Sequence, residues 1–422
     1  MLLEPAFVEA GARPDQFPQA VAFSEADPGH VGGRDRTRNT APVDRRDSAR
    51  AASSKTAPVD RRDSARTASA TKTVLAGTGI SARTTSTARG ASVKAAKASR
   101  AAARRREIVD LRSQSASPVL RIFEDDDFFN IRGKGTDEGY TNGSRLDYFY
   151  VKHHPDRQAD RWLMPDAGKG AVNTYGWGVM EVMFTPTNLR ASAYLPGNYP
   201  YSGAMYLAHT KLSYNPRRRF SFQTELVGGV MGPAAEAGPI QYWFHGAIDY
   251  QRPEGWKNQF PNDILLNENL SAEKEILHVG TGLEWFAGAT GNLGTMLDGG
   301  TAYSTVRVGW MNPYFDGWNA QYQNKKPHQF QLYVFGTPKA EWVAFNSMLE
   351  GGLISRELDT WDRGKFENFA PRVKRGVAEI DYGLVFVYGG FSAAYTQKTA
   401  SATLRGMGMH EVGNISFFIT LR

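Results

Sequence analysis

The chain has 422 residues, a formal net charge of +7 and no cysteine. The absence of cysteine excludes disulfides, thiolate metal sites and cysteine nucleophiles. About +9 of the charge lies in residues 1–116, so the remaining chain is nearly neutral and the high pI describes the N-terminal segment alone. No apolar run reaches the roughly 18 residues of a membrane-spanning helix, so none is predicted.

Residues 1–116 are predicted to be a disordered basic tail. Large apolar side chains are too few there to offset the entropy of ordering. The tail repeats TAPVDRRDSARAAS (40–53) as TAPVDRRDSARTAS (56–69), and no aromatic residue is interleaved with the arginines of the repeat, so we expect no nucleic-acid partner. The first residues lack the basic start and apolar core of a signal peptide. Either the start codon is called too early or export is unusual, and we favour the first interpretation.

From about residue 118 the hydrophobic period is 2, which predicts strands. The segments 202–214 and 218–230, joined at Asn215-Pro216, predict a hairpin. We expect about twelve strands of roughly ten residues each. The other strand-like segments are 118–123, 144–154, 176–186, 276–289, 301–312, 328–349 (broken at Thr337-Pro338), 373–389, 389–399 and 411–421.

Three architectures compete for these strands: a soluble sandwich, a soluble barrel and an outer-membrane barrel. Strands of about ten residues are long for a sandwich. Tyr and Trp near the strand ends suit the aromatic girdle of a membrane barrel, and glycines within strands suit a barrel interior. We therefore predict an all-β fold for residues 117–422, namely a closed antiparallel transmembrane β-barrel with a short helix in one loop.

Residues 232–260 interrupt the strand pattern. Ile240 to Ile248 suit a short helix that ends before Pro253. Gln241 and His245 are four residues apart and share one face of that helix. A long loop with its own helix is usually functional, and His245 is the best general base in the chain. The alternative is an ordinary loop histidine.

A run of four carboxylates, Glu124 to Asp127, opens the segment Phe123 to Val151. Crowded carboxylates need a cation or water to offset their repulsion, and hard oxygen ligands suit calcium or magnesium. The alternative is a solvated acidic turn at a strand end.

Several short blocks, taken in order, resemble the lipid A 3′-O-deacylase family of Gram-negative outer membranes, the LpxR type. The resemblance covers about residues 118–422 and depends on the ordered combination, since no single block is specific. The blocks are EDDDFF (124–129), Thr136-Asp137 with YTNG (140–143), FTP (184–186), NYPYSGAMYL (198–207), GVMGPAAEAGPIQYWFH (229–245), PEGWKNQ (253–259), GNLGT (291–295), SMLEGGL (347–353) and GMGMHEVGNISFF (406–418).

The resemblance implies a twelve-stranded, monomeric barrel in the cell outer membrane that acts on lipid A or lipopolysaccharide. The implied reaction is calcium-dependent hydrolysis of the 3′-linked acyloxyacyl ester. His245 would activate water, with Gln241 one helical turn earlier. Asp126 would bind Ca2+ with Thr141 close to the metal, and Arg190 would face lipid phosphate or the charge that develops in the reaction.

Two departures from the family pattern concern the site. Asp125, a further candidate catalytic residue, stands where the family has asparagine. Asn198-Tyr199-Pro200-Tyr201 stands where the family has Asp-Arg-Pro-Tyr, so a basic residue is lost. These departures leave open a non-catalytic outer-membrane barrel, structural or lipid-binding. A soluble calcium-dependent binding protein with a basic tail is the third alternative.

Overall fold

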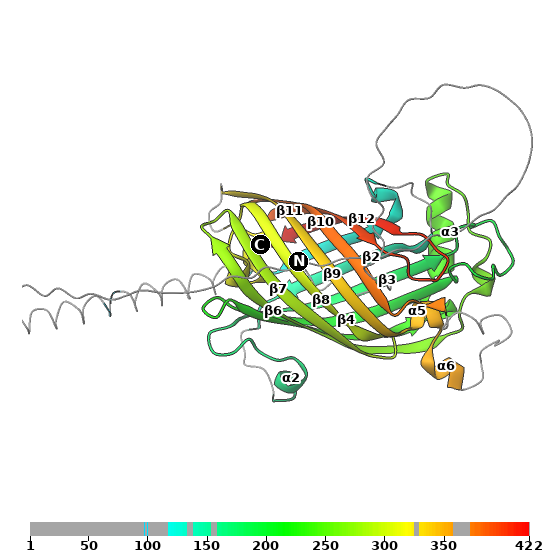
Figure 1. The fold of residues 1–422 in the computed structure, drawn as a ribbon, viewed down its shortest axis with the longest axis horizontal. Helices are drawn as coiled ribbons and strands as arrows, with labels where there is room; N and C mark the ends of the chain where they lie inside the picture. The colour runs from blue at the N-terminus through cyan, green and yellow to red at the C-terminus, as the bar shows by residue number, and fades with distance from the viewer. Residues whose placement is uncertain are drawn as a thin grey trace, which may run out of the picture. The chain divides into compact units, whose positions relative to one another are not determined.

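Twelve antiparallel strands close into a single barrel (Figure 1). The computed structural model describes Lys97, Ser99 and residues 117–132, 138–152, 158–324, 329–357 and 372–421. Apart from Lys97 and Ser99, the predicted tail lies outside the described residues, so the predicted boundary at residue 116 stays a prediction.

Each strand pairs with its neighbours in sequence, and β1 pairs with β12 to close the barrel. A closed barrel leaves no strand edge with unpaired backbone groups, which a bilayer requires. The strands are β1 (Val119–Asp126), β2 (Gly139–Tyr150), β3 (Val172–Thr185), β4 (Ser202–Asn215), β5 (Phe220–Met231), β6 (Asp263–Val279), β7 (Leu283–Gly294), β8 (Leu297–Trp310), β9 (Phe330–Asn346), β10 (Gly376–Tyr388), β11 (Phe391–Ala400) and β12 (His410–Thr420).

The predicted all-β barrel and the 202–214/218–230 hairpin are confirmed, but the predicted strand 276–289 is wrong. This segment contains the end of β6, a turn at Gly280 (φ 59°) and the start of β7. Most of β6 was missed because its inward positions, such as Asn269 and Glu273, are polar and hide the alternation.

The predicted break at Thr337-Pro338 is also wrong, since β9 runs through it. Pro338 has no N–H to donate. It still aligns with Ile380 of β10, whereas the pairing with β8 lapses between Tyr303↔Lys339 and Val306↔Gly336.

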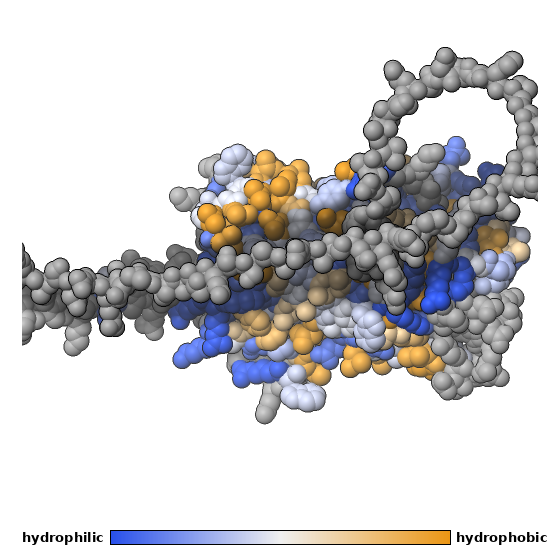
Figure 2. All heavy atoms as spheres, in the orientation of Figure 1, coloured by the Kyte–Doolittle hydropathy of each residue, from blue (hydrophilic) through white to orange (hydrophobic). Residues whose placement is uncertain are grey.

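Many polar side chains point into the barrel, and many of the outward-pointing side chains of the strands are apolar. Arg145 on β2 bonds Asp147 at 2.9 Å and Glu225 at 2.6 Å, and all three are buried inside. Their outward neighbours on β2, Leu146 and Tyr148, are exposed. This alternation is typical of membrane barrels. In Figure 2, apolar patches lie on the upper and lower parts of the visible face, with hydrophilic residues between them.

The remaining elements are short helices at the two ends. They are η1 (Asp127–Phe129), α2 (Gln158–Leu163), η2 (Pro233–Ala235), α3 (Ala237–Ala247), η3 (Trp256–Asn258), η4 (Tyr314–Asp316), α4 (Trp318–Tyr322), α5 (Ser347–Glu350) and α6 (Leu353–Glu357). No helix in the described part of the chain has the length and apolar character to cross a bilayer. We call the end that carries α3 and the β1–β2 connection the α3 end, and the opposite end the η4 end.

Side chains fill the barrel from both ends. At the η4 end, α4 enters the interior, where Trp318 lies 4.1 Å from Phe149 and Tyr322 stacks on Phe418 at 3.8 Å between ring centroids. A second cluster, which includes Tyr140 and Tyr199, fills the α3 end. Thr305, Arg307 and Tyr333 are among the described residues that line an interior pocket of about 50 Å³.

Candidate active site

The helix α3 confirms the predicted loop helix and packs against the outer wall at β3 and β4. Its buried residues are few: Ala237, Gly238, Gln241 and His245. The pair Gln241 and His245 shares one helix face, as predicted from their spacing. The approach of the helix requires small residues, because a Cβ at Gly238 would lie 2.9 Å from the indole of Trp256.

His245 is 5% exposed, and its Nδ1 lies 2.6 Å from the carbonyl oxygen of Gln251. A carbonyl only accepts hydrogen bonds, so Nδ1 carries the proton and Nε2 has the lone pair. The Asp126 carboxylate interacts electrostatically with the imidazole. His245 is therefore held in the tautomer that a general base needs, beside a carboxylate.

The Gln241 side chain has a fixed amide orientation. The indole Nε1 of Trp256, which can only donate, bonds Gln241 Oε1 at 2.7 Å. The amide nitrogen Nε2 is therefore the free end, and it is buried with no hydrogen-bond partner among the described residues. An unsatisfied buried donor is costly. The Nε2–H of Gln241 is therefore suited to donate a hydrogen bond to an oxygen of a bound substrate.

The acidic run divides between the two faces of β1, because successive side chains of a strand alternate. Asp125 points into the barrel and accepts hydrogen bonds from Lys398 (2.8 Å), Tyr140 (2.9 Å) and Asn414 (2.9 Å). The structure thus does not bring this predicted catalytic residue to His245, which lies outside the wall.

Glu124 and Asp126 point outward from the same strand. Asn142 on β2 bridges them, and its amide donates to Glu124 at 2.6 Å and to Asp126 at 3.3 Å. Ser144 also donates to Glu124, at 2.9 Å. The structure therefore brings the predicted metal ligand Asp126 and the predicted base His245 together on the outer wall.

Glu181 is a third carboxylate beside Glu124 and Asp126 on the outer wall, and the sequence analysis did not single it out. It pairs with Ser144 in the β2–β3 register, interacts electrostatically with Glu124, and has one buried carboxylate oxygen without a hydrogen-bond partner among the described residues. Its outward row on β3 also holds Trp177 and Val179, which are exposed. A charged residue in a lipid-facing row is energetically costly. The single glutamate in this apolar row could therefore have indicated a functional position from the sequence alone.

The donor set on the wall suits a hard cation. Thr141 is buried at a β-bulge beside Asn142, and its hydroxyl lies 2.6 Å from that of Thr185. Within the described ranges, no lysine or arginine pairs with Glu124, Asp126 or Glu181. Oxygen ligands and uncompensated carboxylates are the features that calcium sites share.

Comparisons with known proteins identify the family and the fold of this chain. The family model described as outer membrane protein LpxR matches residues 87–421. The chain belongs to the LpxR family. Among solved structures, LpxR from Salmonella typhimurium has a TM-score of 0.54 and 16% sequence identity, over 72% of this chain and 100% of that chain.

Two other solved barrels have lower TM-scores against this LpxR-family protein. The β domain of the Bordetella autotransporter BrkA has a TM-score of 0.38 and 8% identity, over 73% of this chain and 100% of that chain. The translocator domain of the autotransporter NalP from Neisseria meningitidis has a TM-score of 0.35 and 9% sequence identity, over 78% of this chain and 98% of that chain. A search of curated proteins found no match. Family membership and the barrel fold locate the protein in the outer membrane.

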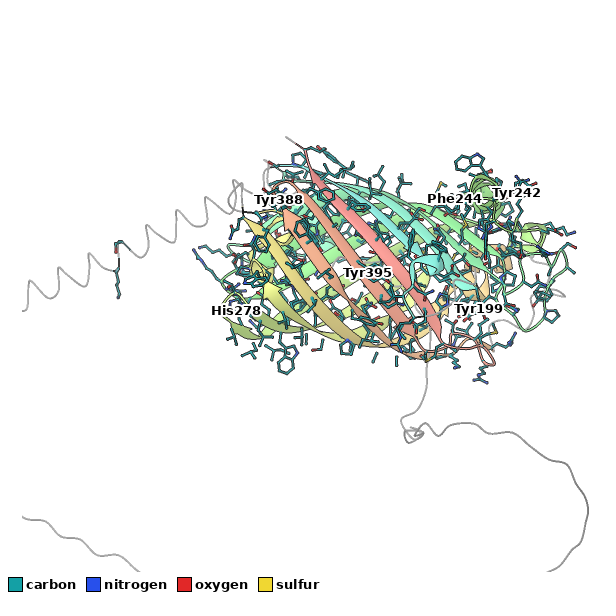
Figure 3. The ribbon with its side chains drawn as sticks, turned by 90° about the horizontal axis from the view of Figure 1, so that it is seen from above. Tyr199, Tyr242, Phe244, His278, Tyr388 and Tyr395 are labelled. Atoms are coloured by element: carbon teal, nitrogen blue, oxygen red, sulfur yellow. The ribbon has the colours of Figure 1, made fainter. Side chains whose placement is uncertain are left out.

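The structure also describes Arg190 and Tyr199 of this LpxR-family protein. Arg190 is exposed in the β3–β4 loop, directly after Leu189, which packs with Ala237 and Trp256. Tyr199, one of the two departures, belongs to the interior cluster at the α3 end, and its hydroxyl contacts that of Thr403 at 2.5 Å (Figure 3). The block Thr136-Asp137 lies outside the described residues.

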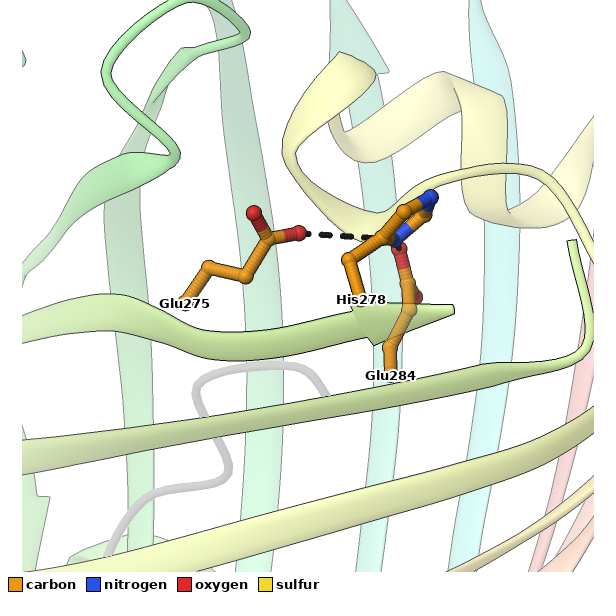
Figure 4. Close-up of side chains that lie close together, drawn as sticks. All are labelled: Glu275, His278 and Glu284. Atoms are coloured by element: carbon orange, nitrogen blue, oxygen red, sulfur yellow. Dashed lines mark ion pairs between the residues drawn. The ribbon is translucent and has the colours of Figure 1, made fainter. Parts of the chain in front are cut away.

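A second titratable cluster lies at the η4 end of this LpxR-family barrel (Figure 4). His278 Nδ1 lies 3.5 Å from Glu275 and 3.2 Å from Glu284. Arg307 pairs with Glu284 at 2.7 Å, and the same carboxylate accepts the backbone N–H of Tyr314 at 2.9 Å. These donors already satisfy the Glu284 carboxylate. We therefore infer that the cluster has a structural role and holds η4 against the β6–β7 turn.

Proposed function

We propose that this protein is a lipid A deacylase that hydrolyses the 3′-linked acyloxyacyl ester in a calcium-dependent reaction. Membership of the LpxR family supports lipid A deacylation in general terms. The observation that carries the finer proposal is that α3 buries two polar residues, Gln241 and His245, against a carboxylate-rich patch on the outside of the barrel wall.

In the proposed reaction, His245 Nε2 removes a proton from water while Gln251 holds Nδ1–H. The resulting hydroxide oxygen bonds to the ester carbonyl carbon, and the C–O bond to the lipid A hydroxyl oxygen then breaks. The His245 imidazolium returns the proton to that oxygen, so water is divided between the fatty acid and the lipid alcohol. No protein nucleophile is required.

Gln241 is proposed to stabilise the negative charge that develops on the carbonyl oxygen. Its Nε2–H is buried, lacks a partner among the described residues, and is aimed by Trp256. Such fixed donors act by electrostatic preorganisation, because they need no reorientation during the reaction.

Asp126, with Glu124, Glu181 and the Thr141 hydroxyl nearby, would hold the calcium ion. Bound calcium would act as a Lewis acid toward the same ester carbonyl. Asp125 is assigned a positioning role, since it fixes the end of β1 through Lys398 and Asn414 inside the barrel.

Arg190 is proposed to contact a phosphate group of the substrate. Its guanidinium is exposed on a loop whose neighbouring residue, Leu189, packs beneath α3. A cation at this rim would orient an anionic lipid without touching the reacting atoms.

A non-catalytic barrel was favoured by the departures at Asp125 and Tyr199. Both side chains point into the barrel and are satisfied there, so neither removes a group from the face that holds His245. This supports the catalytic proposal over the non-catalytic alternative.

Mass spectrometry of lipid A tests the proposal. With the protein in the outer membrane of a host, we expect loss of one 3′ acyloxyacyl group, and no loss after calcium chelation or in His245→Ala. The matched control is His209→Ala, because His209 is also on the outer wall with Nδ1 bonded to a backbone carbonyl, that of Gly176 at 3.0 Å. Undiminished deacylation by His245→Ala in a folded barrel would refute the assigned base.

A further inference from the structure

The helix α3 has the opposite polarity to a surface helix of a water-soluble protein. Its protein-facing side carries Gln241 and His245, whereas large apolar residues point away from the protein. In water, an amphipathic helix buries its apolar face against the protein. The exposed apolar residues of α3 and the segment directly after it are Ile240, Tyr242, Trp243, Phe244, Ile248 and Tyr250.

The residue types on this face are those of a membrane interface. Trp243 is 71% exposed, and Tyr242 and Phe244 flank it on the same helix (Figure 3). Trp and Tyr concentrate where hydrocarbon meets head groups. Helices that lie in this boundary have one strongly apolar face of this kind.

The apolar face of α3 adjoins the lipid-facing surface of the barrel. Ala237, at the start of α3, packs on Gly203 of β4. Four residues along the same strand and on the same outward face, Leu207 is 58% exposed. An outer-membrane barrel presents such outward residues to lipid hydrocarbon, so α3 begins beside a surface that lipid already covers.

A cation borders the apolar face. The guanidinium of Arg252 lies 4.6 Å over the ring of Tyr242 and donates to its hydroxyl at 3.0 Å. Lys257 is exposed shortly after. Positive side chains at the edge of an interfacial helix favour anionic head groups.

We infer that the outward face of α3 is inserted among the acyl chains of outer-leaflet lipid A, and that Arg252 and Lys257 meet its phosphates. The helix thereby holds its polar face, with Gln241 and His245, against the wall at the depth where acyl esters join head groups. This inference depends on the outer-membrane location and not on the proposed catalytic roles, so the two succeed or fail separately.

Nitroxide labelling tests this contact, and the absence of cysteine makes single-site labels possible in the full chain. The barrel carries Trp243→Cys or, as a second site if that variant does not fold, Ile248→Cys. It is placed in vesicles of phosphatidylethanolamine, phosphatidylglycerol and lipid A. Collision of the label with oxygen, which partitions into hydrocarbon, is compared with collision with a water-soluble nickel chelate. Leu207→Cys is the lipid control, and Glu254→Cys, exposed in the loop after α3, is the water control.

We expect the oxygen-to-nickel ratio at position 243 or 248 to match the ratio at 207 and to exceed the ratio at 254. A ratio equal to that at 254 would place the face in water and overturn the inference. Dipolar broadening between labels on different molecules would also overturn it, because a second copy of the chain would then cover the face.

Discussion

At the residue scale, the hydrogen bond from Trp256 to Gln241 offers a test that separates chemistry from packing. Trp256→Phe removes the indole donor but keeps an aromatic ring in the cluster with Ala237 and Leu189. Because the amide is then free to turn, we expect kcat to fall roughly 5- to 10-fold, the effect of about one hydrogen bond, with KM little changed.

Steady-state kinetics on purified barrel in mixed micelles with lipid A measures this split. Trp310→Phe is the matched control, since Trp310 is an exposed indole on β8 at the η4 end. A rise in KM with unchanged kcat would mean that Trp256 only shapes the substrate-binding surface.

Calcium binding is a second prediction at this scale, independent of turnover. Asp126→Asn keeps the size of the side chain but removes a charge from a patch with no lysine or arginine partner among the described residues. We expect the Kd for calcium, measured by isothermal titration calorimetry, to rise at least about tenfold. Asp125→Asn, on the inner face of the same strand, should leave the Kd within a few-fold of the wild-type value. Equal effects of the two substitutions would contradict the outward site.

At the scale of elements, the seating of α3 depends on its small residues. Gly238→Val places a branched side chain against the indole of Trp256, which lies on a cluster that has little free space. We expect α3 to lift from the wall, with activity lost at least about 100-fold, because catalytic groups displaced by about 1 Å cost that much.

The barrel itself should survive this substitution, since α3 lies outside the strands. Heat-modifiable migration on gels should stay as in the wild type, while limited proteolysis between residues 232 and 262 should accelerate. Gly291→Ala is the control, because a Cβ at Gly291 meets nothing within 4 Å. Normal activity in folded Gly238→Val would show that α3 is not the element that positions the site.

The sequence predicted most of this architecture because strand alternation and turn residues are local signals. The loop helix followed from the residues between Ile240 and Pro253, and the shared face of Gln241 and His245 followed from their spacing. The β6 strand was missed since its inward positions are polar, as a barrel interior allows. The acidic run is divided between the two faces of β1 by the same alternation. The sequence did not predict this division, because the predicted strand ended at residue 123, before Asp125 and Asp126.

Other parts of the site depend on contacts between distant segments, which no local pattern contains. Trp256 reaches Gln241 because the loop after α3 folds back along the helix, and the carbonyl that fixes His245 belongs to the same loop. Glu181 approaches Glu124 only through the register of three neighbouring strands.

At the scale of the whole molecule, the filled interior predicts a barrel that does not conduct ions. Trp318 and Tyr322 of α4 occupy the η4 end, and a separate cluster fills the α3 end. A bilayer that contains purified protein should therefore show no steady current above that of lipid alone. Stable single-channel steps would contradict a closed interior and would indicate that α4 leaves the barrel.

The outward position of His245 has a kinetic consequence. An enzyme with its site in a pore or a soluble cleft must extract each lipid from the bilayer, and its rate then follows the amount of substrate in the whole sample. In the proposed reaction the catalytic groups act on the wall beside the leaflet, so encounters with substrate would occur by lateral diffusion in two dimensions. The rate should follow the mole fraction of substrate in the membrane, and adding inert lipid at constant total substrate should slow the reaction.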